Sequence, residues 1–277
     1  MPSIQETALK HGLSPDAPVV AFEGVSIGFE GNEVLRNVSF TVMPGETRIL
    51  LGPAGGGKSV LLKLVDGLLK PDSGRIFVFG EEVTAMPERE LFKLRRRIGM
   101  VFQESALFDS INVEDNVAYR LNEEGVAPEE AHRRVVEALE FVELGHAIEK
   151  FPSELSGGMR RRVSIARAII TGPDLILYDS PTGGLDPITS TTIIALVAKQ
   201  RDVSQTTSLL ITHRLQDAFT LATHYYNQKE QQLEPLPKGT LEENTKFLVL
   251  NEGRVVFDGT TLELTHTEDP WIREYLA

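Results

Sequence analysis

A glycine-rich segment in the first quarter of the chain has the composition and spacing of a phosphate-binding loop. Residues 52–59 read GPAGGGKS and match the pattern G-x-x-x-x-G-K-[ST] at every fixed position. Glycine lets backbone N–H groups approach phosphate oxygens without obstruction from a Cβ atom. In this pattern Lys58 reaches the β- and γ-phosphates, and the Ser59 hydroxyl binds Mg²⁺. We therefore predict a nucleotide-phosphate site here; the alternative is a chance glycine-rich turn.

A carboxylate is also needed to hold magnesium beside such a loop. Asp179 directly follows the apolar run 175–178. The carboxyl end of a buried strand is where ligand-binding residues lie in an α/β sheet. We expect Asp179 to share Mg²⁺ with Ser59; the alternative is that Asp179 only caps the next helix.

Four further motifs follow in an order that resembles the ATP-binding cassette (ABC) ATPases. Residues 155–159 read LSGGM and are similar to the LSGGQ signature of that family, with Met159 in place of glutamine. Gln103 in MVFQ is similar to the Q-loop, GGLD at 183–186 to the D-loop, and His213 in LLITH to the switch histidine. The resemblance covers roughly residues 19–260.

The resemblance implies an α/β fold and a complete set of site residues. The fold would be a P-loop NTPase of the ABC nucleotide-binding type, with a mostly parallel core sheet, an antiparallel β subdomain and an α-helical subdomain. The implied ATP-binding residues, in which Phe29 stacks on adenine, are Phe29, Gly52, Pro53, Ala54, Gly55, Gly56, Gly57, Lys58, Ser59 and Val60. The implied catalytic positions are Gln103, Asp179, Ser180 and His213, of which Gln103 and Asp179 join Ser59 at Mg²⁺, partly through water. As isolated residues, Phe29 would more often belong to a core and His213 would more often be structural.

The resemblance also implies that the site is shared between two subunits. The signature of one subunit would cover the γ-phosphate bound to the other, and ATP would hold the two together. The signature residues are Leu155, Ser156, Gly157, Gly158 and Met159, and the D-loop residues are Gly183, Gly184, Leu185 and Asp186. A homodimer of this chain follows as a hypothesis.

Ser180 departs from the family pattern, which usually has glutamate directly after the aspartate. A serine hydroxyl is not a base at neutral pH, and general-base assistance contributes roughly 10²–10⁴-fold in rate. We expect a retained but slow ATPase in which Gln103 and His213 position water. In one alternative, the Asp186 carboxylate takes the role of the missing glutamate. In the other, the chain is a degenerate cassette that binds ATP and regulates. Val60 is a smaller departure, because many P-loops have threonine there.

Longer stretches resemble one subgroup, the cassettes of MCE-type lipid transporters such as the Mla and Mkl ATPases. They are FQESALFDSINVEDNVAYRL, PSELSGGMRRRVSIARAI, LDPITS and the C-terminal DPWIREYLA. This resemblance implies an MlaE-type permease, an MCE-domain protein in the periplasm, and a phospholipid or related apolar cargo. The chain would then lie on the cytoplasmic face of the membrane. Phe102, Leu107, Phe108 and Ile111 are candidate permease contacts, or alternatively core residues.

The elements that must position these residues alternate between strand and helix. Short β-prone runs at 19–40 predict an antiparallel patch, and an apolar strand and a helix flank the phosphate loop. Further on, the pattern predicts a helix over 159–170, a strand over 174–179, a helix over about 188–201 and a strand over 208–213. This rhythm is typical of a mostly parallel sheet covered by helices.

The expected division of the chain is a cassette between two tails. Residues 1–18 are predicted to be a flexible N-terminal tail, 19–260 the ATPase domain, and 261–277 a C-terminal tail. Within the domain, about 104–165 form a helical subdomain and about 225–245 a polar surface insertion.

Composition excludes several other classes. The formal charge of −12 disfavours nucleic-acid binding, as in a DNA-repair or translation ATPase. The absence of cysteine excludes disulfides, thiolate zinc sites and cysteine nucleophiles. The N-terminus has no apolar signal core, which predicts that the chain is not secreted. The basic clusters at 93–97 and 160–162 are expected to be solvated helix faces or local ion pairs.

Overall fold

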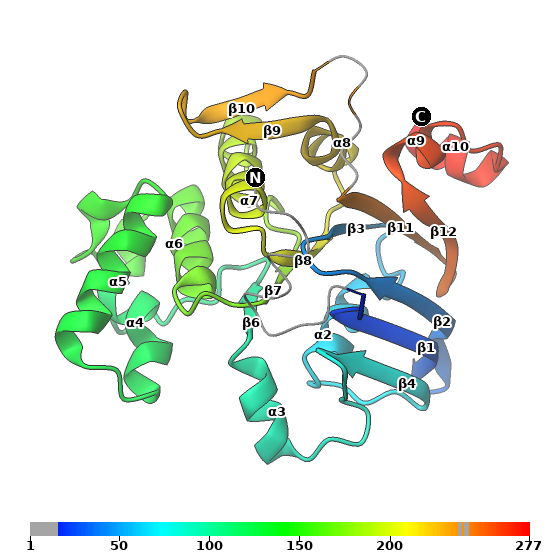
Figure 1. Cartoon of the computed structure of the whole chain (residues 1–277), viewed down its shortest axis with the longest axis horizontal. Coiled ribbons are helices and arrows are strands. Elements are labelled where there is room, and N and C mark those ends of the chain that lie inside the picture. The colour runs from blue at the N-terminus through cyan, green and yellow to red at the C-terminus, as the bar shows by residue number, and fades with distance from the viewer. Residues whose placement is uncertain (1–15, 238–239, 241–243) are drawn as a thin grey trace.

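The computed structural model describes residues 16–237, 240 and 244–277 (Figure 1). Most of the predicted N-terminal tail, residues 1–15, lies outside this described part. A six-stranded sheet forms the centre of the molecule, in the order β12-β11-β3-β8-β7-β6. Its strands are β3 (Thr47–Leu51), β6 (Ile98–Val101), β7 (Leu175–Asp179), β8 (Thr207–Ile211), β11 (Thr245–Asn251) and β12 (Arg254–Thr260). All neighbours are parallel except β11 and β12, so the predicted mostly parallel core sheet is confirmed.

The sheet is apolar on both faces toward the carboxyl ends of its central strands, which are continuous buried apolar runs at 49–51 in β3 and 209–211 in β8. Along β3, Ile49 and Leu51 join one hydrophobic cluster while Leu50 joins the other. The same alternation occurs along β7, where Tyr178 and Leu177 point to opposite faces. Successive side chains of a strand point to opposite faces, so a continuous apolar run requires cover on both sides.

One face of the core sheet is covered by helix α2 (Lys58–Val65) and a smaller antiparallel sheet. That sheet has the order β2-β1-β4-β5. Its strands are β1 (Val20–Phe29), β2 (Asn32–Val42), β4 (Ser73–Val78) and β5 (Glu81–Glu82). The apolar residues of α2 contribute to the same cluster as both sheets, and the predicted antiparallel patch is confirmed. Helix α3 (Glu88–Arg95) precedes β6.

Helices cover the opposite face and extend to one side of the molecule. The extension contains α4 (Val113–Glu123), α5 (Pro128–Phe141) and α6 (Gly157–Ile169), which gather away from the antiparallel sheet in Figure 1. The 3₁₀ turns η1 (Gly145–Ala147) and η2 (Pro152–Glu154) link α5 to α6. Helices α7 (Pro187–Ser204) and α8 (Leu215–Thr223) pack directly on this face of the core sheet, through the hydrophobic cluster that contains Ile49 and Leu51.

The segment predicted as a polar insertion contains a two-stranded hairpin. Strands β9 (His224–Asn227) and β10 (Gln232–Pro235) pair in antiparallel fashion, and the Tyr225 hydroxyl donates to Glu234 at 2.7 Å. Tyr226 is buried in the cluster beneath the core sheet, and Figure 1 shows the hairpin lying over α7. One face of this polar segment is therefore anchored to the core.

The C-terminal segment folds as two short helices, α9 (Thr261–Thr265) and α10 (Pro270–Leu276). Thr260 and Glu263 form a capping box at α9, and the Asp269 side chain accepts the N–H of Ile272 at 3.0 Å. Ile272 is 1% exposed and fastens α10 to the core. None of the helices in the described ranges has both the length and the apolar character needed to cross a bilayer.

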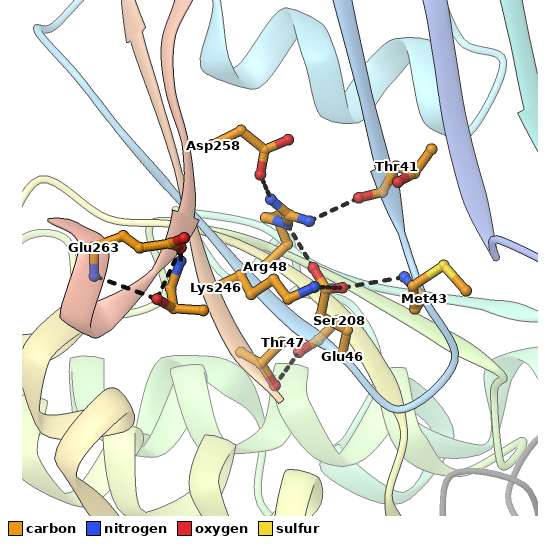
Figure 2. Close-up of polar contacts among 10 residues, drawn as sticks. Thr41, Met43, Glu46, Thr47, Arg48, Ser208, Lys246, Asp258 and Glu263 are labelled. Carbon is orange, nitrogen blue, oxygen red and sulfur yellow. Dashed lines mark hydrogen bonds and ion pairs between the residues drawn. The ribbon is translucent and has the colours of Figure 1, made fainter. Parts of the chain in front are cut away.

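A buried ion network connects three strands of the core sheet, β3, β11 and β12, and reaches β2 of the antiparallel sheet (Figure 2). The Arg48 guanidinium binds Glu46 at 2.5 Å, contacts Asp258 on β12, and donates to the Thr41 carbonyl at 2.8 Å. Lys246 on β11 lies 3.6 Å from the second oxygen of Glu46. Because Arg48 and Glu46 are almost fully buried, each needs the other to offset its lost hydration.

Candidate functional site

The phosphate loop connects β3 to α2, as the motif requires. At Gly52, where φ is 138°, a Cβ atom would collide with the Leu250 carbonyl. At Gly57, where φ is 89°, a Cβ atom would lie 2.7 Å from the Leu35 side chain. Both positions therefore require glycine. A pocket of about 300 Å³ opens over the loop and is lined by Val34, Gly55, Gly56, Gly57, Lys58, Ser59, Val60 and His213.

Lys58 begins α2 and points back into the loop. Its Nζ donates to the carbonyls of Gly52 at 2.9 Å and Pro53 at 2.7 Å. Burial lowers the pKa of Lys58, and the nearby Asp179 carboxylate opposes that shift. An ammonium held by two neutral carbonyls in a desolvated site gains strongly from an anionic partner, so this group is suited to binding phosphate.

Ser59, near the start of α2, and Asp179, at the end of β7, meet at the carboxyl end of the core sheet. The Ser59 hydroxyl donates to Asp179 Oδ1 at 3.2 Å, although 120 residues separate them. Asp179 is the last residue of β7, so its carboxylate emerges at the carboxyl end of the strand. A hydroxyl and a carboxylate are hard oxygen ligands of the kind that Mg²⁺ prefers, so this pair fits the predicted metal.

His213 completes the lining of the phosphate pocket from the loop after β8. Burial and the Lys58 charge lower the pKa of His213, while Asp179 acts in the opposite direction. Its imidazole is therefore neutral at pH 7 and can accept one hydrogen bond and donate another. This group can orient a water molecule beside the phosphates.

Ser180 lies in a constrained turn after β7. Its φ of 48° is left-handed, its side chain is buried, and its hydroxyl lies 3.5 Å from Asp179 Oδ1. Gln103 follows β6 and is exposed. A Cβ atom on Gly183 would lie 3.1 Å from the Ser180 carbonyl and 3.3 Å from Gln103 Cγ. The Q-loop and the D-loop therefore touch within one subunit.

Asp186 is occupied as a helix cap rather than free beside the phosphates. Its carboxylate accepts the N–H groups of Ile188 and Thr189, both at 3.0 Å, and the Thr189 hydroxyl at 2.6 Å. These hydrogen bonds lower the pKa of Asp186. A carboxylate stabilised in this way is a poor candidate for the missing base.

The signature and Phe29 do not line the phosphate pocket of the same chain. Ser156 caps α6 and accepts the N–H of Met159 at 3.3 Å, so the helix begins two residues before the predicted start. Ser156 and Gly157 are exposed, as groups that bind a second molecule must be. Phe29 is 43% exposed at the end of β1. Its predicted stacking on adenine stays a prediction.

One of the basic clusters was predicted wrongly. Arg95, Arg96 and Arg97 do form ion pairs, with Glu88 in the same helix and with Glu124 and Asp174 farther along the chain. In the second cluster Arg160 is exposed, but Arg161 is only 4% exposed and contacts four backbone carbonyls around the site. Three consecutive arginines have the same local sequence signal. The sequence therefore does not show which of them faces the protein interior once α6 has formed.

Two other contacts at the site join residues that are distant in sequence. The buried Asp217 carboxylate on α8 accepts the Thr182 hydroxyl at 2.5 Å, and burial raises the pKa of Asp217. The Tyr275 hydroxyl on α10 accepts the Gly52 N–H at 3.0 Å. Neither contact has a sequence signal, because each depends on how a helix docks onto the core.

The family model for ABC transporters matches residues 35–183, which is more than half of the chain. The intermembrane phospholipid transport system ATP-binding protein MlaF of Escherichia coli K12 is 34% identical over 261 residues, covering 94% of this chain and 89% of MlaF. MlaF of Haemophilus influenzae is 38% identical, covering 76% of this chain and 79% of that protein. The probable ribonucleotide transport ATP-binding protein mkl of Mycobacterium leprae is 37% identical, covering 76% of this chain and 61% of that protein.

Solved cassette structures match most of the chain. The dimeric post-hydrolysis structure of the cassette MJ0796 bound to ADP and Pi has a TM-score of 0.73 at 27% identity, covering 87% of this chain and 98% of that one. The cbiO1 structure from Clostridium perfringens has a TM-score of 0.76 at 26% identity, covering 94% of both chains. These matches confirm the predicted cassette fold. The chain belongs to the ABC transporter family and is the ATP-binding subunit of such a transporter.

Proposed function

We propose that this subunit hydrolyses ATP to drive the transport of phospholipid or a related lipid by an MCE-type system. The observation that carries the proposal is the convergence of Lys58, Ser59 and Asp179 on one pocket, with His213 on its wall. The cargo is supported by the two MlaF relatives, whose names state phospholipid transport.

The site residues suggest how the phosphates are bound and attacked. Lys58 exchanges its two carbonyl partners for β- and γ-phosphate oxygens, and Ser59 and Asp179 hold Mg²⁺. The metal, when bound, neutralises charge on the phosphates. Gln103 and the neutral His213 orient the attacking water. Phe29 and the glycines of the loop bind the rest of ATP.

The exposed signature points to a site completed by a second cassette. Ser156 and Gly157 stand at the N-terminus of α6, where unpaired N–H groups favour an anion. We propose that they contact the γ-phosphate bound to an identical partner subunit, with the D-loop at the same interface. Light scattering of the ATP-loaded chain tests this, and a monomer even with the permease present would refute it.

The membrane partner is proposed to be an MlaE-type permease, with an MCE-domain protein beyond it and this chain on the cytoplasmic face. Copurification of the tagged full chain from its own cells, followed by mass spectrometry, tests the two partner assignments, and proteolysis of the chain in sealed inside-out vesicles tests its location on the cytoplasmic face. Recovery of a permease without an MCE-domain protein would refute the lipid assignment, and no nucleic acid is expected in the complex.

A groove of about 360 Å³ between the Q-loop and α4 is the proposed permease contact. Its apolar lining includes Phe102, Phe108 and Tyr119, and the rings of Phe108 and Tyr119 lie 4.8 Å apart. Of the other predicted contacts, Leu107 is half-buried and packs against the core, and Ile111 is half-buried. The groove therefore depends more on Phe102 and Phe108 than on these two.

Phe108→Asp should abolish copurification of the permease while leaving the thermal midpoint of unfolding within a few degrees. Phe151→Asp is the matched control, because Phe108 and Phe151 are 45% and 44% exposed but only Phe108 lines the groove. Unchanged permease binding by the Phe108 variant, or equal loss in both variants, would contradict the assignment.

Ser180 is proposed to make hydrolysis slow rather than absent. Supplying a general base contributes roughly 10²–10⁴-fold, which is roughly 3–5 kcal/mol of barrier. Ser180→Glu should therefore raise the steady-state rate of phosphate release, whereas Ser180→Gln, which has the same length but no basic oxygen, should not. A wild-type rate that is already ordinary and unchanged by glutamate would show that no base is missing. Phosphate release absent from the wild type would instead favour a regulatory cassette.

A further inference from the structure

Arg161 on the signature helix α6 binds two loops of the candidate site at once, the Q-loop after β6 and the connection from β7 to α7. Its guanidinium donates to the carbonyls of Phe102 at 3.1 Å, Ser180 at 3.2 Å and Gly183 at 3.3 Å, and also to that of Gln103. Phe102 and Gln103 belong to the Q-loop, Ser180 to the turn after β7, and Gly183 to the D-loop. The Q-loop follows β6, whereas Ser180 and Gly183 lie in the single connection from β7 to α7, where the Gly183 N–H donates to the Ser180 carbonyl at 2.9 Å.

The charge of Arg161 has no acidic partner in the part of the chain that the structure describes. The side chain is 4% exposed, and its Nε is buried without a hydrogen-bond partner. Burial lowers the pKa of Arg161, yet a guanidinium remains protonated at any physiological pH. A buried cation is costly unless polar groups surround it, so the four carbonyl dipoles are what makes this position tolerable.

Only arginine has a side chain that can make this arrangement. Its planar group presents five N–H donors in a fixed fork, whereas the lysine ammonium is a compact point charge. The loops are also in direct contact, since a Cβ atom on Gly183 would lie 3.1 Å from the Ser180 carbonyl and 3.3 Å from Gln103 Cγ. A shift of one loop therefore displaces the other.

The carbonyls that Arg161 binds extend from the permease groove to the end of β7 that carries Asp179. Phe102 is exposed on the groove wall, and its carbonyl is bound by Arg161. The same guanidinium binds the carbonyl of Ser180, the residue next to Asp179. None of these four carbonyls belongs to a residue that lines the phosphate pocket.

We propose that Arg161 is a positioning residue that couples the permease groove to the hydrolytic end of β7. It sets the Q-loop, the turn at Ser180 and the D-loop in the geometry that hydrolysis needs, without contributing to ATP binding. This inference rests on the proposed ATPase function.

The test compares Arg161→Lys and Arg161→Met with wild type and with Arg160→Met. Arg160 is the matched control, because it is exposed and makes a single 3.4 Å hydrogen bond to the Pro152 carbonyl. We expect kcat for ATP to fall about tenfold or more in both Arg161 variants, while the ATP Kd and KM stay within about twofold of wild type. The control should retain wild-type values.

Coupling itself is tested by a double-mutant cycle between Phe102→Ala and Arg161→Lys. If Arg161 transmits displacement of the groove wall, the two changes in kcat will be strongly non-additive. Amide hydrogen exchange should also rise at 102–106 and 180–184 in Arg161→Lys, and not at 52–60.

Several outcomes would overturn the proposal. They are an unchanged kcat in a folded Arg161→Lys variant, additive effects in the cycle, and a parallel loss of ATP affinity and kcat. Unfolding of both Arg161 variants would also overturn it, because the side chain would then determine the fold rather than position the loops. A wild-type chain that binds ATP but never releases phosphate would refute the proposed ATPase function, whereas these outcomes concern Arg161 alone.

Discussion

The hydroxyl of Tyr275 offers a sharp test of how the C-terminal helix supports the phosphate loop. This hydroxyl accepts the Gly52 N–H at 3.0 Å and lies 3.3 Å from the Gly52 carbonyl, across 223 residues of sequence. The Tyr275 ring stacks on Trp271 at 5.4 Å, and the buried Ile272 anchors the same helix. Tyr275→Phe removes one oxygen atom and leaves this apolar packing in place.

The expected magnitude follows from the partners that the substitution leaves unpaired. Gly52 is buried, so its N–H loses a hydrogen bond that water cannot readily replace. The Gly52 carbonyl still has Lys58 Nζ at 2.9 Å, but Lys58 is predicted to leave for phosphate when ATP binds. The ATP-bound loop of the variant would then have both polar groups of Gly52 unpaired. An unsatisfied buried group costs about 1–3 kcal/mol, so ATP affinity should fall at least about fivefold.

Isothermal titration with ATP and Mg²⁺ measures this loss directly. Steady-state kinetics should show a raised KM with kcat nearly unchanged, which is the opposite of the pattern expected for Arg161. Tyr225→Phe is the matched control, because it deletes a tyrosine hydroxyl that donates to Glu234 in the β9–β10 hairpin. Its ATP Kd should equal that of the wild type.

A Tyr275→Phe variant with wild-type ATP affinity and unchanged amide exchange at Gly52 would refute the reasoning. That result would mean that packing of α10 alone holds the loop. An equal loss of affinity in the Tyr225 control would refute it too, since the effect would then not be specific to the loop.

Two further predictions concern stability. Arg48→Met removes the buried partner of Glu46, whose remaining cation is Lys246 at 3.6 Å, and should lower the free energy of unfolding by about 3 kcal/mol in urea titrations. Arg75→Met breaks an exposed pair with Glu23 and should cost no more than about 1 kcal/mol; equal costs would contradict the importance of burial. Burial raises the pKa of Asp66 to about 6, against the opposing charge of Arg95. In the unfolded chain the Asp66 carboxyl loses its proton near pH 4. The Asp66 contribution to the free energy of unfolding therefore falls by up to about 3 kcal/mol as pH rises from about 4 to about 6. Above that interval it stays constant. Asp66→Asn should therefore become more stable relative to wild type across that interval, and a difference that does not vary with pH would refute the assignment.

The phosphate loop could be predicted because its information is local. Eight consecutive residues encode the loop, and the flanking apolar runs encode the strand and the helix that orient it. The position of Asp179 could be predicted equally well, because a carboxylate at the end of a buried strand must emerge at the edge of the sheet. The parallel core sheet followed from strands that alternate with helices.

Other features depended on elements that meet only in the folded chain. The run 160–162 consists of three arginines that the sequence does not distinguish. The packing of α6 against the core leaves Arg160 exposed and buries Arg161. The segment at 225–245 is polar, yet Tyr226 turns one face of its hairpin into the core.

Sequence alone determined where the phosphate loop and Asp179 lie, because the pattern at 52–59 and the apolar strand before Asp179 are local. The same patterns predict which groups meet the nucleotide. Tertiary structure alone decided which distant side chains hold those groups still. Arg161 and Tyr275 act on loops that are 19 to 223 residues away. Contacts of this range depend on the docking angles of whole helices, which no local pattern of residues encodes.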